Sequence, residues 1–227
     1  MIAVISDIHG NVTALEAVLA EIDRLGPCAV VVAGDIALGG PRPRECVALI
    51  RRRGYPTIRG NTDEWLTARP AEVTGAIGWC ASRLSEEDRR FLTGLPFLWR
   101  REDPAGDLVV VHATPWDVGA VLRPDAPEAE VRRAFDEARA AALVYGHIHT
   151  AHIRELDGKL LVNGGSVGIP FDGDWRAAFA TLTSDGGRWR AALHRVSYDR
   201  DAVIADSRRT DNPERDRFSR RLETASF

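Results

Sequence analysis

Five short motifs in this sequence carry side chains that can bind metal ions. Each follows an apolar segment, and the five are Asp7-Ile8-His9, Gly34-Asp35, Gly60-Asn61-Thr62-Asp63, His112 and Gly146-His147-Ile148-His149. Carboxylate and amide oxygens combined with imidazole nitrogens suit Mn, Fe, Ni, Co or Zn. One Asp-x-His pair occurs by chance, whereas five such motifs in this order predict a hydrolytic site with two metal ions.

The segments around the first three motifs alternate between strand and helix. Apolar runs at 2–6, 29–33 and 57–59 predict strands, and helical periodicity predicts helices at 15–25 and 43–53. This rhythm indicates parallel strands joined by right-handed crossovers, and such sheets bind ligands beyond the carboxyl ends of their strands. Asp7, Asp35 and Asn61 are therefore expected to meet at one edge of a sheet.

The rest of the chain is predicted to be helical at first and then mostly β. Ser85 to Asp88 resembles a capping box that begins a helix through 92, and a second helix is predicted at 127–142. Predicted strands lie at 97–101, 108–111, 143–145, 153–156, 159–162, 177–182 and 189–196. We expect a second sheet stacked on the first and a single domain over 1–227, with 208–227 as a surface helix or a frayed tail.

Composition excludes several classes of partner. Hydrophobic residues make up 44% and charged residues 28% of the 227 residues, which is ordinary for a globular chain with a core, and the net charge is −3. This balance gives no reason to expect a nucleic-acid polymer or a membrane as partner. Three cysteines without Cys-x-x-Cys spacing, and the absence of a signal peptide or long apolar run, favour the cytoplasm, with each cysteine a mostly buried apolar side chain.

The motifs together resemble those of the calcineurin-like metallophosphoesterase superfamily. The likeness extends over about residues 1–200 and includes Asn163-Gly164-Gly165-Ser166-Val167-Gly168, which is similar to a stretch in small bacterial and archaeal phosphodiesterases and in diadenosine tetraphosphatase-like proteins. The resemblance implies an α/β fold, a four-layer α/β/β/α sandwich of two stacked mixed sheets flanked by helices.

The same resemblance implies the metal ligands. The first metal would be held by Asp7, His9, Asp35 and His149, and the second by Asp35, Asn61, His112 and His147, with Asp35 bridging both. Two divalent transition-metal ions are expected, with Mn favoured and Fe, Ni, Co or Zn as alternatives. The implied reaction is attack of a metal-bridging hydroxide on a phosphoester.

One residue departs from the superfamily pattern. Many members carry His after the motif Asn, where this chain has Thr62, and threonine cannot serve as a general acid near neutral pH. We therefore expect a preference for good leaving groups and a phosphodiesterase rather than a monoesterase. The residues expected to take part in catalysis are Asp35, Asn61, Thr62 and His112.

Several side chains near the motifs are open to two interpretations. His152 is a conceivable replacement acid, although a structural role is favoured, and Trp116 and Trp175 could stack on a base, although packing at the sheet edge is slightly favoured. Asp63 is interpreted as a helix-terminal residue and not a ligand. Phe171 stands where related sequences often have Arg, and the Arg-rich tail is expected to be a solvated surface.

The expected substrate is a small phosphoester or a nucleotide-like molecule. A dinucleoside polyphosphate phosphatase or a phosphoprotein phosphatase is an alternative of the same class. A metal-binding scaffold for protein interactions is an alternative of another class, because a subunit of the eukaryotic retromer complex is similar in fold. The eight ligand positions, with Asp35 used twice, disfavour the scaffold, and a homo-oligomer is compatible with the sequence but not required.

Overall fold

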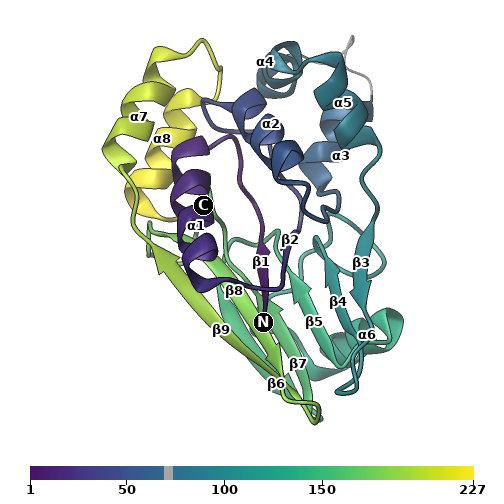
Figure 1. The fold of residues 1–227 in the computed structure, drawn as a ribbon. Coiled ribbons are helices and arrows are strands. Elements are labelled where there is room, and N and C mark those ends of the chain that lie inside the picture. Colours follow the sequence, from purple (N-terminus) through teal and green to yellow (C-terminus); the bar gives the residue numbers. More distant parts are fainter. Residues whose placement is uncertain (69–73) are drawn as a thin grey trace.

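The computed structural model describes residues 1–68 and 74–227, which form two stacked β-sheets flanked by helices (Figure 1). The first sheet has the strand order β2 (Ala29–Val32), β1 (Ile2–Ile5), β8 (Ala177–Ser184) and β9 (Trp189–Val196). In this sheet β1 is parallel to β2 and antiparallel to β8. The second sheet has the order β3 (Leu98–Arg101), β4 (Leu108–Val111), β5 (Ala142–Tyr145), β7 (Lys159–Asn163) and β6 (His152–Leu156).

The strand β1 shows how the sequence builds the layers. Side chains on a strand alternate between its two faces. Ile2 and Val4 pack into the core between the two sheets, and Ala3 and Ile5 pack into the core between the first sheet and its helices. Because both faces of β1 are covered, its four residues are apolar without exception.

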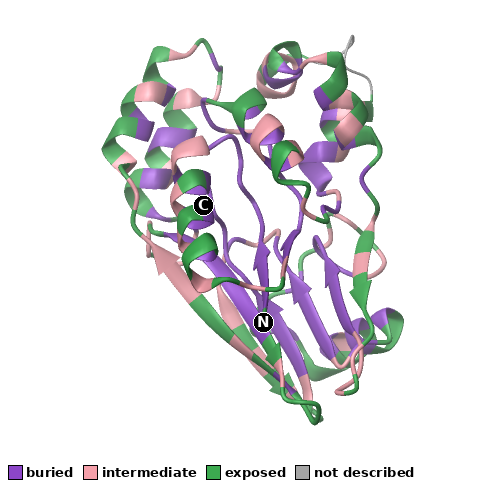
Figure 2. Ribbon diagram, in the orientation of Figure 1, coloured by how far each residue is buried: buried purple, intermediate pink, exposed green. Residues whose placement is uncertain are grey.

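Helices cover the outer face of each sheet. The helices on the side of the first sheet are α1 (Val12–Leu25), α2 (Pro43–Arg53), α3 (Asn61–Ala68), α4 (Gly75–Arg83), α5 (Glu86–Thr93), α7 (Arg200–Arg209) and α8 (Arg215–Thr224). The second sheet packs its Val109, Leu143 and Leu161 against α6 (Glu128–Ala138). The predicted four-layer α/β/β/α sandwich is thereby confirmed, and Figure 2 shows buried inner strands beside the more exposed edge strands β3 and β9.

The helix α1 illustrates the local signals that fix these elements. The side chain of Asn11 caps its first turn by accepting a hydrogen bond of 3.1 Å from the Ala14 N–H, and Gly26, with φ of 62°, ends it in the left-handed conformation. Leu15, Val18 and the other buried residues of α1 recur at helical spacing. The capping box at Ser85 is also confirmed, with Ser85 and Asp88 bonded reciprocally.

Two predicted strand arrangements were wrong. Residues 57–59 form no strand: Thr57 makes one parallel bridge with Val32, and Arg59 already donates to the Pro96 carbonyl, so the segment leaves β2 after one contact. The hairpin β8–β9 joins the first sheet and not the second. Residues 177–182 are buried without alternation, as a strand covered on both faces must be.

The tail is ordered and is not frayed. Residues 215–224 form α8, whose Phe218 and Leu222 pack on Val203 and Ile204 of α7.

Other local predictions were met in part. The helix predicted at 127–142 is present but ends at Ala138. Cys46 and Cys80 are buried as predicted, but Cys28 is exposed. Within the part of the chain that the structure describes, no helix is both long and apolar enough to cross a bilayer.

Candidate metal centre

The motif residues meet where parallel strands end. Asp7 follows β1, Asp35 follows β2, and His112 follows β4. Backbone hydrogen bonds tie these segments together: the Asp7 N–H donates to Gly34 at 3.1 Å, the His9 N–H to Asp35 at 3.0 Å, and the Gly146 N–H to His112 at 2.8 Å. The expected convergence of Asp7 and Asp35 at one sheet edge is confirmed. The second sheet also contributes to the site, through His112 and the segment after β5.

Backbone strain is concentrated at these residues. Eight non-glycine residues among those described have positive φ, and five of them are Asp7, His9, Asp35, His147 and His149, with φ between 49° and 66°. Left-handed conformations are uncommon outside glycine and cost free energy that surrounding structure must offset. The strain turns each side chain off the strand direction and into a shared space.

Two glycines permit the close approach of the motifs. A Cβ on Gly60 would overlap the Oδ1 atom of Asp35, and a Cβ on Gly146 would overlap the Ser6 hydroxyl and the Oδ2 atom of Asp7. The Gly that precedes Asn61 and the Gly that precedes His147 are therefore required by packing against the carboxylates.

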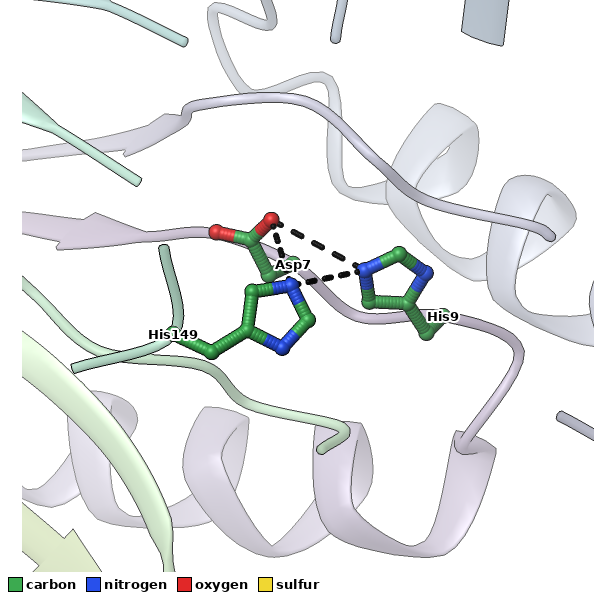
Figure 3. A group of neighbouring side chains, drawn as sticks. All are labelled: Asp7, His9 and His149. Atoms are coloured by element: carbon green, nitrogen blue, oxygen red, sulfur yellow. Dashed lines mark hydrogen bonds and ion pairs between the residues drawn. The ribbon is translucent and has the colours of Figure 1, made fainter. Parts of the chain in front are cut away.

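The first cluster comprises Asp7, His9 and His149 (Figure 3). The Nδ1 atoms of His9 and His149 donate to the Leu38 and Ile169 carbonyls at 2.6 and 2.5 Å, so in the neutral rings each Nε2 carries a lone pair. These two Nε2 atoms are 3.1 Å apart, and Asp7 Oδ1 lies 3.2 Å from that of His149. This carboxylate oxygen is buried and has no hydrogen-bond partner among the described residues. Three acceptors directed at one point fit a bound cation.

The second cluster has the same character. The His112 Nδ1 donates to the Ala33 carbonyl at 2.7 Å, which leaves the lone pair of its Nε2 facing Asn61 Oδ1 at 3.0 Å. The Nδ1 of His147 lies 2.9 Å from the same Asn61 oxygen. The His112 Nε2 and the Asn61 oxygen are both acceptors, and a cation bound by both would satisfy them, so these residues also fit a metal ion.

Asp35 lies between the two clusters. Its Oδ2 is 3.6 Å from the Nε2 of His9, and its Oδ1 is 3.5 Å from the Nε2 of His112. Asp63 holds this residue in place, because its carboxylate accepts the N–H groups of Asp35 and Gly60, both at 2.8 Å. Burial and the charge of Asp35 raise the pKa of Asp63 to about 6, against the lowering effect of these hydrogen bonds.

The buried charges shift the histidines in opposite directions. Burial alone would lower the pKa of His9, but the nearby carboxylates of Asp7, 3.7 Å from its Nε2, and Asp35 raise it above the usual 6.5. The pKa of His112 is raised in the same way by Asp35 and Asp7, which outweigh burial. Burial and the neighbouring His112 lower the pKa of His147. The carboxylates therefore attract cations, whether protons or metal ions, to this site.

The two clusters open into a cavity of about 540 Å³. His9, Asp35, Asn61, Thr62, His147 and His149 line its floor. Another wall comes from the tail of the chain and includes Arg217, Phe218, Arg221 and Phe227. Most arginines of the tail are exposed, as expected of a solvated surface, but this part of the tail also lines the cavity, which was not expected. Trp65 of α3 also lines the cavity and was missed by the sequence analysis, although its place four residues after Asn61 puts it on the same side of a helix.

Comparison with known proteins assigns this arrangement to a family. Residues 1–187 match the calcineurin-like phosphoesterase superfamily domain. The chain belongs to that superfamily. Its family is one of phosphoester hydrolases that use divalent metal ions, and the buried clusters of this phosphoesterase supply candidate ligand groups for them.

Similar proteins cover nearly the whole chain. The chain is 30% identical over 223 residues to MJ0912, an uncharacterized protein of Methanocaldococcus jannaschii, with 88% of each chain covered. Its structure is similar to that of a metallophosphoesterase from Sphaerobacter thermophilus, with a TM-score of 0.82, 30% identity and 99% of each chain covered. It also has the fold of the hypothetical protein PH1004 from Pyrococcus horikoshii, with a TM-score of 0.85, 21% identity and 98% of each chain covered.

Of the remaining candidate residues, Thr62 lines the cavity, whereas His152 and the two tryptophans do not. The hydroxyl of Thr62 is buried and has no hydrogen-bond partner among the described residues. His152 is not part of the cavity lining and is bonded to the Tyr145 hydroxyl and the Thr150 carbonyl. Trp116 and Trp175 pack under Arg133 and Arg200 respectively, which agrees with the packing interpretation.

Proposed function

We propose that this protein is a dinuclear metal-dependent phosphoesterase that acts preferentially on phosphodiesters. The observation that carries the proposal is the pair of buried acceptor clusters with Asp35 between them. Asp7, His9, Asp35 and His149 would hold one ion, and Asp35, Asn61, His112 and His147 the other. Asp35 can serve both because each of its oxygens faces a different cluster.

The protein's own residues position these ligands before an ion binds. Backbone carbonyls fix the ring orientation and tautomer of His9, His112 and His149, and the His147 N–H fixes Asp7 by donating to its Oδ2 at 2.9 Å. Bound divalent ions would polarise phosphoryl oxygens and lower the pKa of water, which provides a nucleophile near neutral pH.

Thr62 supports the preference for diesters. Its hydroxyl can donate a hydrogen bond to a phosphoryl oxygen, and its N–H holds Asp35 Oδ1 at 3.0 Å, but it cannot protonate a leaving group near neutral pH. General acid catalysis typically contributes about 10²–10⁴-fold, so good leaving groups are expected to react fastest. A nitrophenolate leaving group needs little such assistance.

The test compares hydrolysis of bis-p-nitrophenyl phosphate and p-nitrophenyl phosphate. The protein is stripped of metal and resupplied with Mn, Fe, Ni, Co or Zn one at a time. Asp35→Asn is the test variant, and Asp125→Asn, which alters an exposed carboxylate of similar type, is its control. We expect metal-dependent cleavage of the diester by the wild type and the control, and none by Asp35→Asn.

Two results would count against the proposal. Faster cleavage of the monoester would contradict the preference for diesters while leaving the metal site intact. Stoichiometric binding of metal without turnover of either substrate would instead favour a metal-binding scaffold of the same fold. Metal content, measured on the same samples, separates these results from simple failure to load the site.

A further inference from the structure

The C-terminal helix α8 forms the wall of the cavity that faces the candidate metal centre. It is held there by Phe218 and Leu222, which pack with Ile169, and by Asn212, whose side-chain amide donates to the Gly39 carbonyl at 2.9 Å. Residues 215–224 lie beyond the segment that matches the superfamily domain. The wall therefore lies outside the matched superfamily domain, in a segment that the similar structure from Sphaerobacter thermophilus also spans, since 99% of each chain is covered.

Arg221 is the unusual residue of this wall. Its guanidinium lies 5.3 Å from the ring centre of Phe171 and 4.6 Å from that of Phe227, and these two rings contact each other edge to face. Its Nε atom is buried and has no hydrogen-bond partner among the described residues. Several other arginines of α7 and α8 have a carboxylate partner: Arg208 pairs with Glu223 at 2.7 Å and Arg217 with Glu214 at 3.5 Å.

The surroundings of Arg221 favour an anion. Burial lowers the pKa of Arg221 and the positive charge of Arg217 lowers it further, while the carboxylate of Glu214, which also lines the cavity, acts in the opposite direction. An anion beside the half-buried guanidinium would relieve the first two costs, because a partly desolvated cation is stabilised by a paired charge. Arginine also matches phosphate geometry through two parallel hydrogen bonds.

An anion bound by Arg221 would lie apart from a group bound at the metal-ligand clusters. The ring of Phe171 stacks on that of His149 with centroids 4.4 Å apart, and the Arg221 guanidinium lies near the same phenylalanine. One aromatic side chain thus lies between the guanidinium and the first ligand cluster. Because Arg221, His9 and His149 line the same cavity, an anion bound by Arg221 shares that cavity with the group at the metal centre.

We propose that Arg221 binds a second phosphate of the substrate while the scissile phosphoester occupies the metal-ligand clusters. The substrate class is a nucleotide with two separate phosphate groups, whose base can contact the apolar cavity residues Trp65 and Ile77. Arg221 is a specificity residue and takes no part in bond cleavage. The placement of the scissile phosphoester at the metal-ligand clusters rests on the proposed phosphoesterase function. Binding of the second phosphate by Arg221 can be measured without turnover.

The test measures binding of two probes to the manganese-loaded protein by calorimetry. Adenosine monophosphate and an adenosine bisphosphate with a phosphate on each side of its ribose differ by one phosphate. We expect the wild type to bind the bisphosphate more tightly and Arg221→Gln to lose about tenfold or more of that preference. Arg220→Gln, which changes an exposed arginine on the same helix, is expected to keep the preference.

A third variant separates charge from packing. Arg221→Lys keeps the positive charge and is expected to retain part of the preference, with unchanged melting temperature and manganese content. Equal preference in Arg221→Gln and Arg220→Gln would overturn the proposal, as would an equal loss in the lysine and glutamine variants. If the preference depends on Arg221 but no substrate is hydrolysed, the phosphoesterase proposal fails and the second phosphate site stands.

Discussion

The two walls of the cavity are built by different physical means. The metal-ligand wall consists largely of buried side chains, several of them on loops with positive φ, and backbone carbonyls fix the rings of His9, His112 and His149. The α8 wall is held by apolar packing of Phe218 and Leu222, and its arginines reach the cavity from a surface helix. The first wall suits chemistry that requires fixed geometry, whereas the second can change without disturbing it.

The strongest test of this contrast removes a side chain from the rigid wall. His149→Ala deletes one of the three converging acceptors of the first cluster. We expect loss of one metal equivalent and a fall in metal-dependent turnover of more than about hundredfold, because even residues that only orient ligands are worth about 10–100-fold. Metal analysis and kinetics measure both. His194→Ala, which removes a histidine hydrogen-bonded to Thr181, should retain metal and turnover.

A change in the anchoring of α8 should lower the stability of the fold without changing its metal content. Leu222→Ala removes a buried side chain and is expected to lower the free energy of unfolding by about 2–3 kcal/mol, while metal stoichiometry stays that of the wild type. Denaturant unfolding and metal analysis measure these quantities. Leu193→Ala, at a position 36% exposed, is the control and should have a smaller effect. Loss of metal in Leu222→Ala would show that the walls are not independent.

The close approach of the motifs can be tested at Gly60. An added methyl group would overlap Asp35, so Gly60→Ala is expected to cost about 1–3 kcal/mol of stability and to weaken metal binding. The matched control is Gly187→Ala, because a Cβ there meets its nearest atom at an ordinary 3.6 Å. Thermal unfolding of both variants, with and without metal, measures the difference. Equal stability of the two would refute the packing requirement.

The smallest effect concerns pH. The pKa values of His9 and His112 are raised above 6.5 in the metal-free fold, so their contribution to stability is present below pH 6.5 and lost as pH rises through the folded values. Metal ions replace those protons, and each displaced proton changes apparent metal affinity by up to about tenfold per pH unit. The stabilisation by metal, measured as the shift in melting temperature, should therefore grow with pH. A shift independent of pH would contradict this assignment.

The sequence by itself determined the motif-bearing half of the site. Short-range signals were sufficient there: apolar runs fixed the strands, and the handedness of crossovers brought Asp7 and Asp35 to one edge. The same reasoning failed at residues 57–59, where pairing of Arg59 with Pro96 ended the strand contact. It also failed for β8 and β9, because strand order depends on long-range pairing that local patterns do not encode.

Only the tertiary structure decided the second wall. The residues Phe218 and Leu222 mark an amphipathic helix, but their pattern does not identify the surface that receives it. That surface, formed by Ile169 and α7, places Arg221 beside Phe171, fifty positions earlier in the chain. Hydrophobic burial is non-directional, so the sequence specified that α8 would be covered, and only shape complementarity in the folded protein specified where.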